Sequence, residues 1–166
     1  MTRYADVANK VDAFFARVAT RHSRDMQCNS GCSDCCAVRL TVTGVEAQAI
    51  RDFVAEWSSS RRATLAANVA AAPAGRCAAL DPGGRCLVYD ARPLVCRSHG
   101  VPIRMTAVSL PVVQACSRNF TQHGPAAADP DCILDQTTLS ALTLAADRAA
   151  GNDGTRFDLA AILAEC

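Results

Sequence analysis

The sequence predicts a mainly α-helical single domain over residues 1–166, with one short β-hairpin, organised around a cysteine-rich metal centre. Three observations lead to this fold class. Apolar residues recur at helical spacing near the start of the chain. Four cysteines crowd into nine residues as Cys28-x3-Cys32-x2-Cys35-Cys36. Four more follow downstream, at Cys77, Cys86, Cys96 and Cys116.

The first half of the chain predicts three helices. Residues 3–24 place one apolar stripe along a helix, made of Tyr4, Val7, Val11, Phe14, Phe15 and Val18. A loop of small and polar residues follows around the first cysteines. Thr43 and Glu46 then form the pattern of a capping box, which predicts a helix continuing to about Trp57. The serines at 58–60 can cap an Ala-rich helix that ends before Pro73.

The second half is more irregular. Asp81-Pro82-Gly83-Gly84 is a turn sequence between Cys77 and Cys86, so a short hairpin should bring these two cysteines together, as a metal knuckle requires. Prolines between residues 91 and 120 oppose long helices and favour loops and short extended pieces. Asp129-Pro130 predicts a helix start, with the helix running to about Ala150, and a last helix covers residues 157–165.

Charge and hydropathy limit the partners and the compartment. The chain carries 17 basic and 16 acidic residues, a formal net charge of +1, and has no basic stripe, so nucleic acid and anionic membranes are not favoured partners. No uncharged run approaches the roughly 20 residues of a membrane span. Charges throughout the first 25 residues interrupt any hydrophobic signal region. We therefore expect a cytoplasmic protein, in which clustered cysteines indicate metal binding or catalysis rather than disulfides.

The cysteine spacing is compatible with two kinds of metal centre. Thiolates are soft anionic ligands that suit zinc or iron–sulfur clusters. The three cysteines of the Cys28-x3-Cys32-x2-Cys35 loop could surround one iron–sulfur cluster with a fourth ligand from elsewhere, whereas zinc more often uses pairs of cysteines. Because neighbouring side chains usually diverge, Cys35 and Cys36 are expected to serve different metals, to bridge two metals, or to include one bystander.

Other candidate residues are ranked below these eight cysteines. Cys132 and Cys166 lie outside the clustered spacing and are interpreted as buried small residues. His99 could replace one thiolate, while His22 and His123 are weaker candidates. Five arginines lie close to cysteines in the sequence, where they could stabilise the negative charge of several thiolates. They are Arg39, Arg85, Arg92, Arg97 and Arg118.

The ordered set of motifs resembles a bacterial family, the YkgJ-like cysteine-cluster proteins. The motifs are the Cys28–Cys36 cluster, then Thr41–Glu46, Cys77, Gly84-Arg85-Cys86-Leu87-Val88-Tyr89 and Arg92-Pro93-Leu94-Val95-Cys96-Arg97. That family is described as a putative zinc- or iron-chelating domain with eight characteristic cysteines, and a related domain in flagellin lysine methylases is linked to an iron–sulfur cluster. The resemblance covers a metal-binding region at residues 28–118. It implies eight ligands, namely Cys28, Cys32, Cys35, Cys36, Cys77, Cys86, Cys96 and Cys116.

These observations favour a metal-chelating protein that binds zinc or iron. An iron–sulfur cluster is one form that the bound iron could take. An iron–sulfur accessory factor or enzyme in methylation or redox chemistry is the first alternative, and a thiol-redox sensor is the second. The sequence contains no nucleotide-binding loop and no evident acid–base pair, so it assigns neither an activity nor a catalytic residue. Metal ions are the only partners that it predicts.

Overall fold

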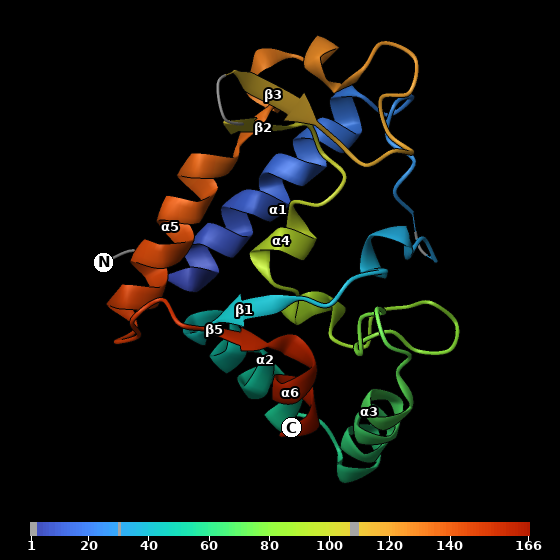
Figure 1. The fold of residues 1–166 in the computed structure, drawn as a ribbon, viewed down its shortest axis with the longest axis vertical. Helices are drawn as coiled ribbons and strands as arrows, with labels where there is room; N and C mark the ends of the chain where they lie inside the picture. Colours follow the sequence, from blue (N-terminus) through green and yellow to red (C-terminus); the bar gives the residue numbers. More distant parts are fainter. Residues whose placement is uncertain (1–2, 30, 107–109) are drawn as a thin grey trace. The chain divides into compact units, whose positions relative to one another are not determined.

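The computed structural model describes residues 3–29, 31–106 and 110–166 (Figure 1). Its helices outweigh its short strands, so the mainly α prediction is confirmed. The chain divides into two compact units, each assembled from two stretches of sequence. The first unit contains residues 1–29 and 94–149, and the second contains residues 30–93 and 150–166. No helix in the described part of the chain is both long enough and apolar enough to cross a membrane.

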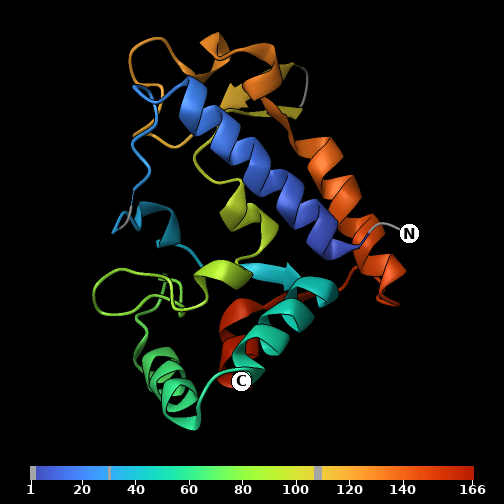
Figure 2. The ribbon, with the colours of Figure 1, turned by 180° about the vertical axis from the view of Figure 1, so that it is seen from behind.

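The first unit is built on two long helices that lie side by side (Figure 2). They are α1 (Tyr4–Arg21) and α5 (Gln136–Ala149). The apolar stripe predicted for the first helix is buried, since Val7 and Val11 pack in one core cluster and Val18 packs in another. The unit also holds the one-turn helix α4 (Leu94–Arg97), the 3-10 turns η3 (Pro125–Ala127) and η4 (Pro130–Cys132), and three short strands.

The three strands of the first unit form a small mixed sheet. Strand β2 (Ile103–Thr106) lies in the middle, with β3 (Pro111–Gln114) antiparallel on one side and β4 (Leu134–Asp135) parallel on the other. The predicted helix start at Asp129 is wrong, because α5 begins only at Gln136. The backbone N–H of Leu134 instead donates to the carbonyl of Pro102, and this sheet pairing outweighs the local helix signal.

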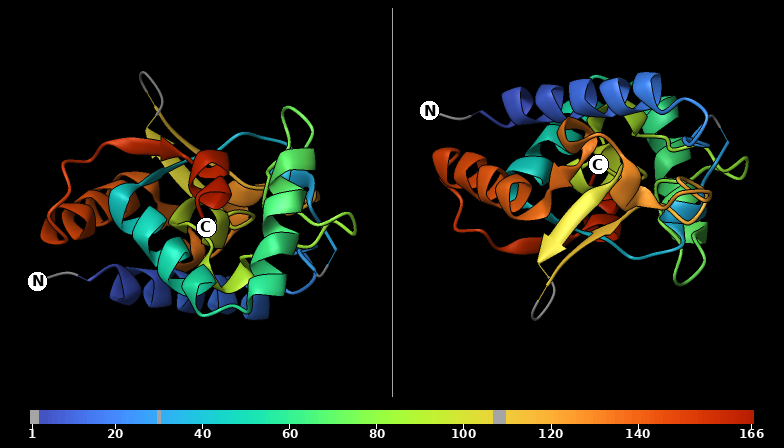
Figure 3. Two further views of the ribbon diagram at one scale, coloured as in Figure 1. Left: turned by 90° about the horizontal axis from the view of Figure 1, so that it is seen from below. Right: turned by 90° about the horizontal axis from the view of Figure 1, so that it is seen from above.

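The second unit packs three helices around one core. They are α2 (Gly44–Ala55), α3 (Ser59–Ala71) and α6 (Leu159–Ala164), and the left view of Figure 3 shows α6 between the other two. Ile50, Leu65 and Leu163 are almost fully buried between them. The unit also contains the 3-10 turns η1 (Asp34–Cys36) and η2 (Tyr89–Ala91).

The second unit also contains a two-stranded sheet. Strand β1 (Thr41–Thr43) pairs antiparallel with β5 (Arg156–Asp158). The last helix was predicted from Phe157, but Phe157 is in this strand, and Asp158 caps α6 by accepting the N–H of Ala160. The strand pairing therefore shortens the helix at its N-terminus.

The predicted capping box at the start of α2 is confirmed. The Thr43 side chain accepts the N–H of Glu46, while Oε2 of Glu46 accepts the Thr43 N–H at 2.9 Å and the Thr43 hydroxyl at 3.0 Å. Thr43 and Glu46 are each only 4% exposed, so the loss of either side chain would leave polar atoms of the other buried without a hydrogen bond. The predicted cap of α3 is also present, with Ser58 accepting the N–H of Arg61.

We therefore expect Thr43→Val to lower the free energy of unfolding by about 1–2 kcal/mol, because the variant keeps the side-chain volume but loses the cap. Thr64→Val is the matched control, since the exposed Thr64 hydroxyl only donates to the Ser60 carbonyl within α3. Chemical denaturation of both variants measures the difference. Equal stabilities of the two variants would contradict the role assigned to the buried cap.

Candidate metal centre

The eight predicted ligands divide between the two units. The second unit holds five of them, Cys32, Cys35, Cys36, Cys77 and Cys86. The first unit holds Cys28, Cys96 and Cys116.

Backbone hydrogen bonds connect the cysteine loop of the second unit to the Cys77 segment. The N–H of Cys36 donates to the Ser33 carbonyl at 2.9 Å and closes the turn η1. The N–H of Cys77 donates to the Cys36 carbonyl at 2.8 Å. Two cysteines that lie 41 positions apart in the sequence are thus tied together through their main chains.

The predicted turn between Cys77 and Cys86 forms around Asp81. The Asp81 carboxylate accepts the Arg85 N–H at 2.8 Å, and the Asp81 carbonyl accepts the N–H of Gly84 at 3.0 Å. Gly84 has a φ of +76°, a conformation that a side chain would disfavour. Strand pairing across the turn extends to one antiparallel bridge, between Leu80 and Cys86, so the predicted hairpin is present only in this minimal form.

The turn places one backbone N–H group near the sulfur of Cys77 and another near the sulfur of Cys86. The Ala79 N–H lowers the pKa of Cys77, and the Val88 N–H lowers the pKa of Cys86. In each case the donor is two residues after the cysteine. Hydrogen bonds of this kind stabilise a thiolate over a thiol, so the local backbone favours the form of cysteine that binds metal.

Burial acts in the opposite direction on the same sulfurs. The pKa of the Cys86 thiol is raised to about 11, mainly by burial and also by the nearby Cys77 and Cys35, although the Val88 N–H and Arg92 act to lower it. Burial also raises the pKa of Cys77. Several neighbouring thiolates in a partly buried site therefore repel one another unless a cation lies between them. Zinc or iron provides such a cation, so the donor set fits the predicted metal.

The adjacent pair Cys35 and Cys36 does not diverge as predicted. Their sulfurs lie 3.9 Å apart, well beyond the roughly 2.05 Å of a disulfide bond. Two thiolates on one tetrahedral zinc, with Zn–S bonds of about 2.3 Å, are separated by about 3.8 Å. The separation of the two sulfurs is therefore compatible with one shared metal ion as well as with the arrangements expected from the sequence.

In the first unit, Asn119 holds the sulfur of Cys28. The Asn119 Nδ2 donates to the Cys28 sulfur at 3.3 Å and to the Gly100 carbonyl at 2.7 Å, while its Oδ1 accepts the Gln27 N–H at 2.8 Å. The backbone N–H of Asn119 donates to the Cys116 carbonyl at 2.8 Å. One buried amide thus connects the segments of two predicted ligands. Sequence reasoning missed Asn119, because no local spacing relates it to Cys28.

Most of the predicted arginines are paired with carboxylates. Arg39 pairs with Asp158, Arg85 with Asp81, and Arg97 with Asp12. Arg92 stacks over the Tyr89 ring at 3.5 Å, and its charge lowers the pKa of Cys86. Arg92 is therefore an arginine that the structure relates electrostatically to a predicted ligand.

A family model described as CxxCxxCC, a putative zinc- or iron-chelating domain, matches residues 27–123, more than half of the chain. The chain belongs to the CxxCxxCC family. The match confirms the resemblance seen in the motifs, and it contains all eight predicted ligands together with Gly100 and Asn119. It excludes His22, Cys132 and Cys166. No curated protein and no solved structure matches the chain significantly.

The raised pKa of Cys86 predicts slow alkylation in the metal-free, reduced CxxCxxCC protein. The thiolate is the reactive form, so at about pH 8 Cys86 should react more slowly than the exposed Cys35. The Cys86 rate should then rise about tenfold for each pH unit until the pH approaches 11. Iodoacetamide labelling followed by peptide mass spectrometry measures both residues in one sample. A Cys86 rate that levels off near pH 9 would contradict the effect of burial.

The close approach of Gly100 to Cys28 predicts a second outcome. A Cβ on Gly100, which has a φ of +103°, would lie 2.7 Å from the Cys28 sulfur and 3.2 Å from Asn119 Nδ2. Gly100→Ala should therefore displace the sulfur and lower both the melting temperature and the bound metal. Gly75→Ala is the matched control, because Gly75 also has a positive φ but a Cβ there meets nothing within 4 Å. Equal losses of melting temperature and bound metal in both variants would show that backbone strain alone causes the effect.

Proposed function

We propose that this CxxCxxCC protein binds zinc or iron through eight cysteines. The ligands are Cys28, Cys32, Cys35, Cys36, Cys77, Cys86, Cys96 and Cys116. One observation supports the proposal: a tight turn places Cys77 near enough to Cys86, and Cys35 near enough to both, to raise their pKa values, and a backbone N–H group lowers the pKa of each of the two turn cysteines. That combination provides thiolate ligands at a site whose charge requires a cation. A reducing compartment such as the cytoplasm keeps such thiols available for metal.

A second candidate function is an iron–sulfur centre that takes part in methylation or redox chemistry. The specific observation in its favour is a pocket of about 210 Å³ in the second unit, lined by Cys77 and, among others, by Arg39 and Asp158. A catalytic centre leaves a coordination position or a cluster edge open to a pocket, whereas a structural zinc site is closed by four protein ligands. The pocket next to a predicted ligand is the feature that an active centre would use.

Purification without oxygen, followed by elemental analysis and visible absorption, distinguishes these functions. Zinc in a colourless protein supports chelation in a closed site. Iron with inorganic sulfide and a charge-transfer band supports the iron–sulfur alternative. Reversible disulfides in a protein that takes up neither metal would support a thiol-redox sensor and overturn the proposal.

Substitution of single cysteines tests the ligand set. Cys32→Ser in the second unit and Cys96→Ser in the first should each strongly reduce the metal-to-protein ratio, because a hydroxyl is a harder and much less acidic ligand than a thiol. Cys166→Ser is the matched control, since the Cys166 thiol donates to the Ile162 carbonyl at 3.1 Å and burial raises its pKa. Comparable metal loss in Cys166→Ser and Cys32→Ser would show that the division into ligands and bystanders is wrong.

A further inference from the structure

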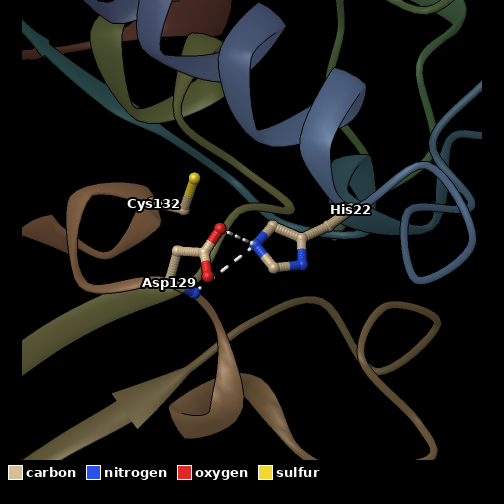
Figure 4. Close-up of side chains that lie close together, drawn as sticks. All are labelled: His22, Asp129 and Cys132. Carbon is tan, nitrogen blue, oxygen red and sulfur yellow. Dashed lines mark hydrogen bonds and ion pairs between the residues drawn. The ribbon is translucent and has the colours of Figure 1, made fainter.

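A second set of ligand-type side chains lies in the first unit, outside the residues that match the family. His22, Asp129 and Cys132 each offer one ligand atom, and these three atoms all lie within 4.8 Å of one another (Figure 4). Among the residues that the structure describes, this is the one group of three or more His, Cys, Asp or Glu that meets this criterion. All three residues lie outside residues 27–123, so the family match does not account for them.

The three side chains come from two segments that are far apart in the sequence. His22 is the residue that ends α1, and Asp129 immediately precedes the turn η4, which ends at Cys132. The Cys132 N–H donates to the Asp129 carbonyl at 2.8 Å, so the turn places both side chains near His22. Protein contacts hold the turn against α1 without any metal, because Arg17 donates to the Asp131 carbonyl and Arg21 donates to both Asp131 carboxylate oxygens.

The His22 ring is oriented like that of a metal ligand. Its Nε2 accepts the Asp129 N–H at 3.4 Å and lies 3.7 Å from Asp129 Oδ2. Its Nδ1 lies 3.8 Å from a carboxylate oxygen of Asp25. A carboxylate facing the other ring nitrogen is the usual arrangement for a histidine that binds metal through Nε2. The His22 side chain is only 15% exposed and its ring packs against Phe120, so the orientation is well constrained.

The spacing and the chemistry of the three groups fit zinc. A zinc ion would take the Nε2 lone pair of His22 in place of its long, 3.4 Å hydrogen bond with the Asp129 N–H, and nitrogen and oxygen ligands on one tetrahedral zinc lie about 3.3 Å apart. Imidazole, carboxylate and thiolate are the three ligand types that zinc takes in proteins, and three protein ligands leave a fourth position for water. Cys132 is fully buried, whereas Asp129 is half-exposed and leaves the site accessible to ions from solution.

Arg21 would oppose a metal ion, because it interacts with the Cys132 sulfur as well as with two nearby carboxylates. Its Nη1 lies 3.7 Å from Asp129 Oδ2 but only 2.7 Å from Asp131 Oδ2. Because Asp131 takes the guanidinium through both carboxylate oxygens, it balances much of the Arg21 charge. Asp25 and Asp129 then leave the immediate surroundings of His22 negative.

We propose that His22, Asp129 and Cys132 form a zinc site that uses none of the eight cysteines proposed as ligands. The bound ion joins the C-terminal end of α1 to the turn that leads into β4. This site assigns Cys132 a ligand role, in place of the buried bystander that the sequence favoured, and it gives His22 priority over the other two histidines. It does not depend on metal binding at the cysteine cluster.

Histidine-selective ¹⁵N NMR of the full chain tests the proposal, since the protein contains only three histidines. Spectra are compared with excess Zn²⁺ and after treatment with EDTA. We expect Zn²⁺ to shift the Nε2 resonance of His22, identified because it disappears in His22→Gln. His99→Gln and His123→Gln should retain it. If the wild-type His22 resonance does not respond to Zn²⁺, the proposal is overturned.

The other two ligands are tested by the same signal. Asp129→Asn and Cys132→Ser should each abolish or greatly weaken the zinc-dependent shift of His22. Asp6→Asn is the matched control, because it changes a carboxylate that pairs with Arg3 in the first turn of α1, and it should retain the shift. Cys32→Ser should retain it as well, so a failure of the cysteine centre and a failure of this site are distinguishable. A shift that persists in Asp129→Asn or in Cys132→Ser would overturn the three-ligand site.

Discussion

Mutual repulsion among closely placed cysteine sulfurs is the constraint on which the proposed metal centre depends. In the second unit, burial raises the pKa of Cys77 and of Cys86, Cys35 raises both further, and Cys77 also raises that of Cys86. Backbone N–H groups and Arg92 offset only part of this effect. A divalent ion is the counter-charge that allows several of these thiols to ionise together. Metal binding and the packing of this unit are therefore coupled through the same few sulfurs.

The structure controls these sulfurs mainly through the main chain rather than through charged side chains. Ala79 and Val88 act on their sulfurs by backbone N–H groups, and the Cys36 carbonyl holds the Cys77 segment in place. In the first unit, the Asn119 side chain performs the same task for Cys28. Most of the arginines that the sequence suggested as counter-charges are paired with carboxylates instead. Such neutral donors favour a thiolate without competing with a metal cation for the site.

The positions of the helices along the sequence were largely predictable, whereas the small sheets were not. The apolar stripe of α1 and the capping residues of α2 and α3 are local signals, and the structure confirms them. The helix predicted from Asp129 and the one predicted from Phe157 both begin later than expected. In each case a short strand lies directly before the helix, because it pairs with a strand that is more than 30 residues away in the sequence, and the 3-10 turn η4 precedes β4. Local propensity carries no information about such a partner.

The sequence by itself determined the family, the metal-binding character and the eight cysteines proposed as ligands, since soft ligands at short spacings are a direct property of the chain. The tertiary structure alone decided which groups surround them. It placed Asn119 on Cys28, brought the Cys35 and Cys36 sulfurs to 3.9 Å, and assembled His22 with Asp129 and Cys132. The Cys35–Cys36 contact joins neighbours whose side-chain directions the sequence does not fix. The other contacts join residues that are about 90 to 110 positions apart in the sequence. Their geometry arises only when helices and turns pack, which no local pattern encodes.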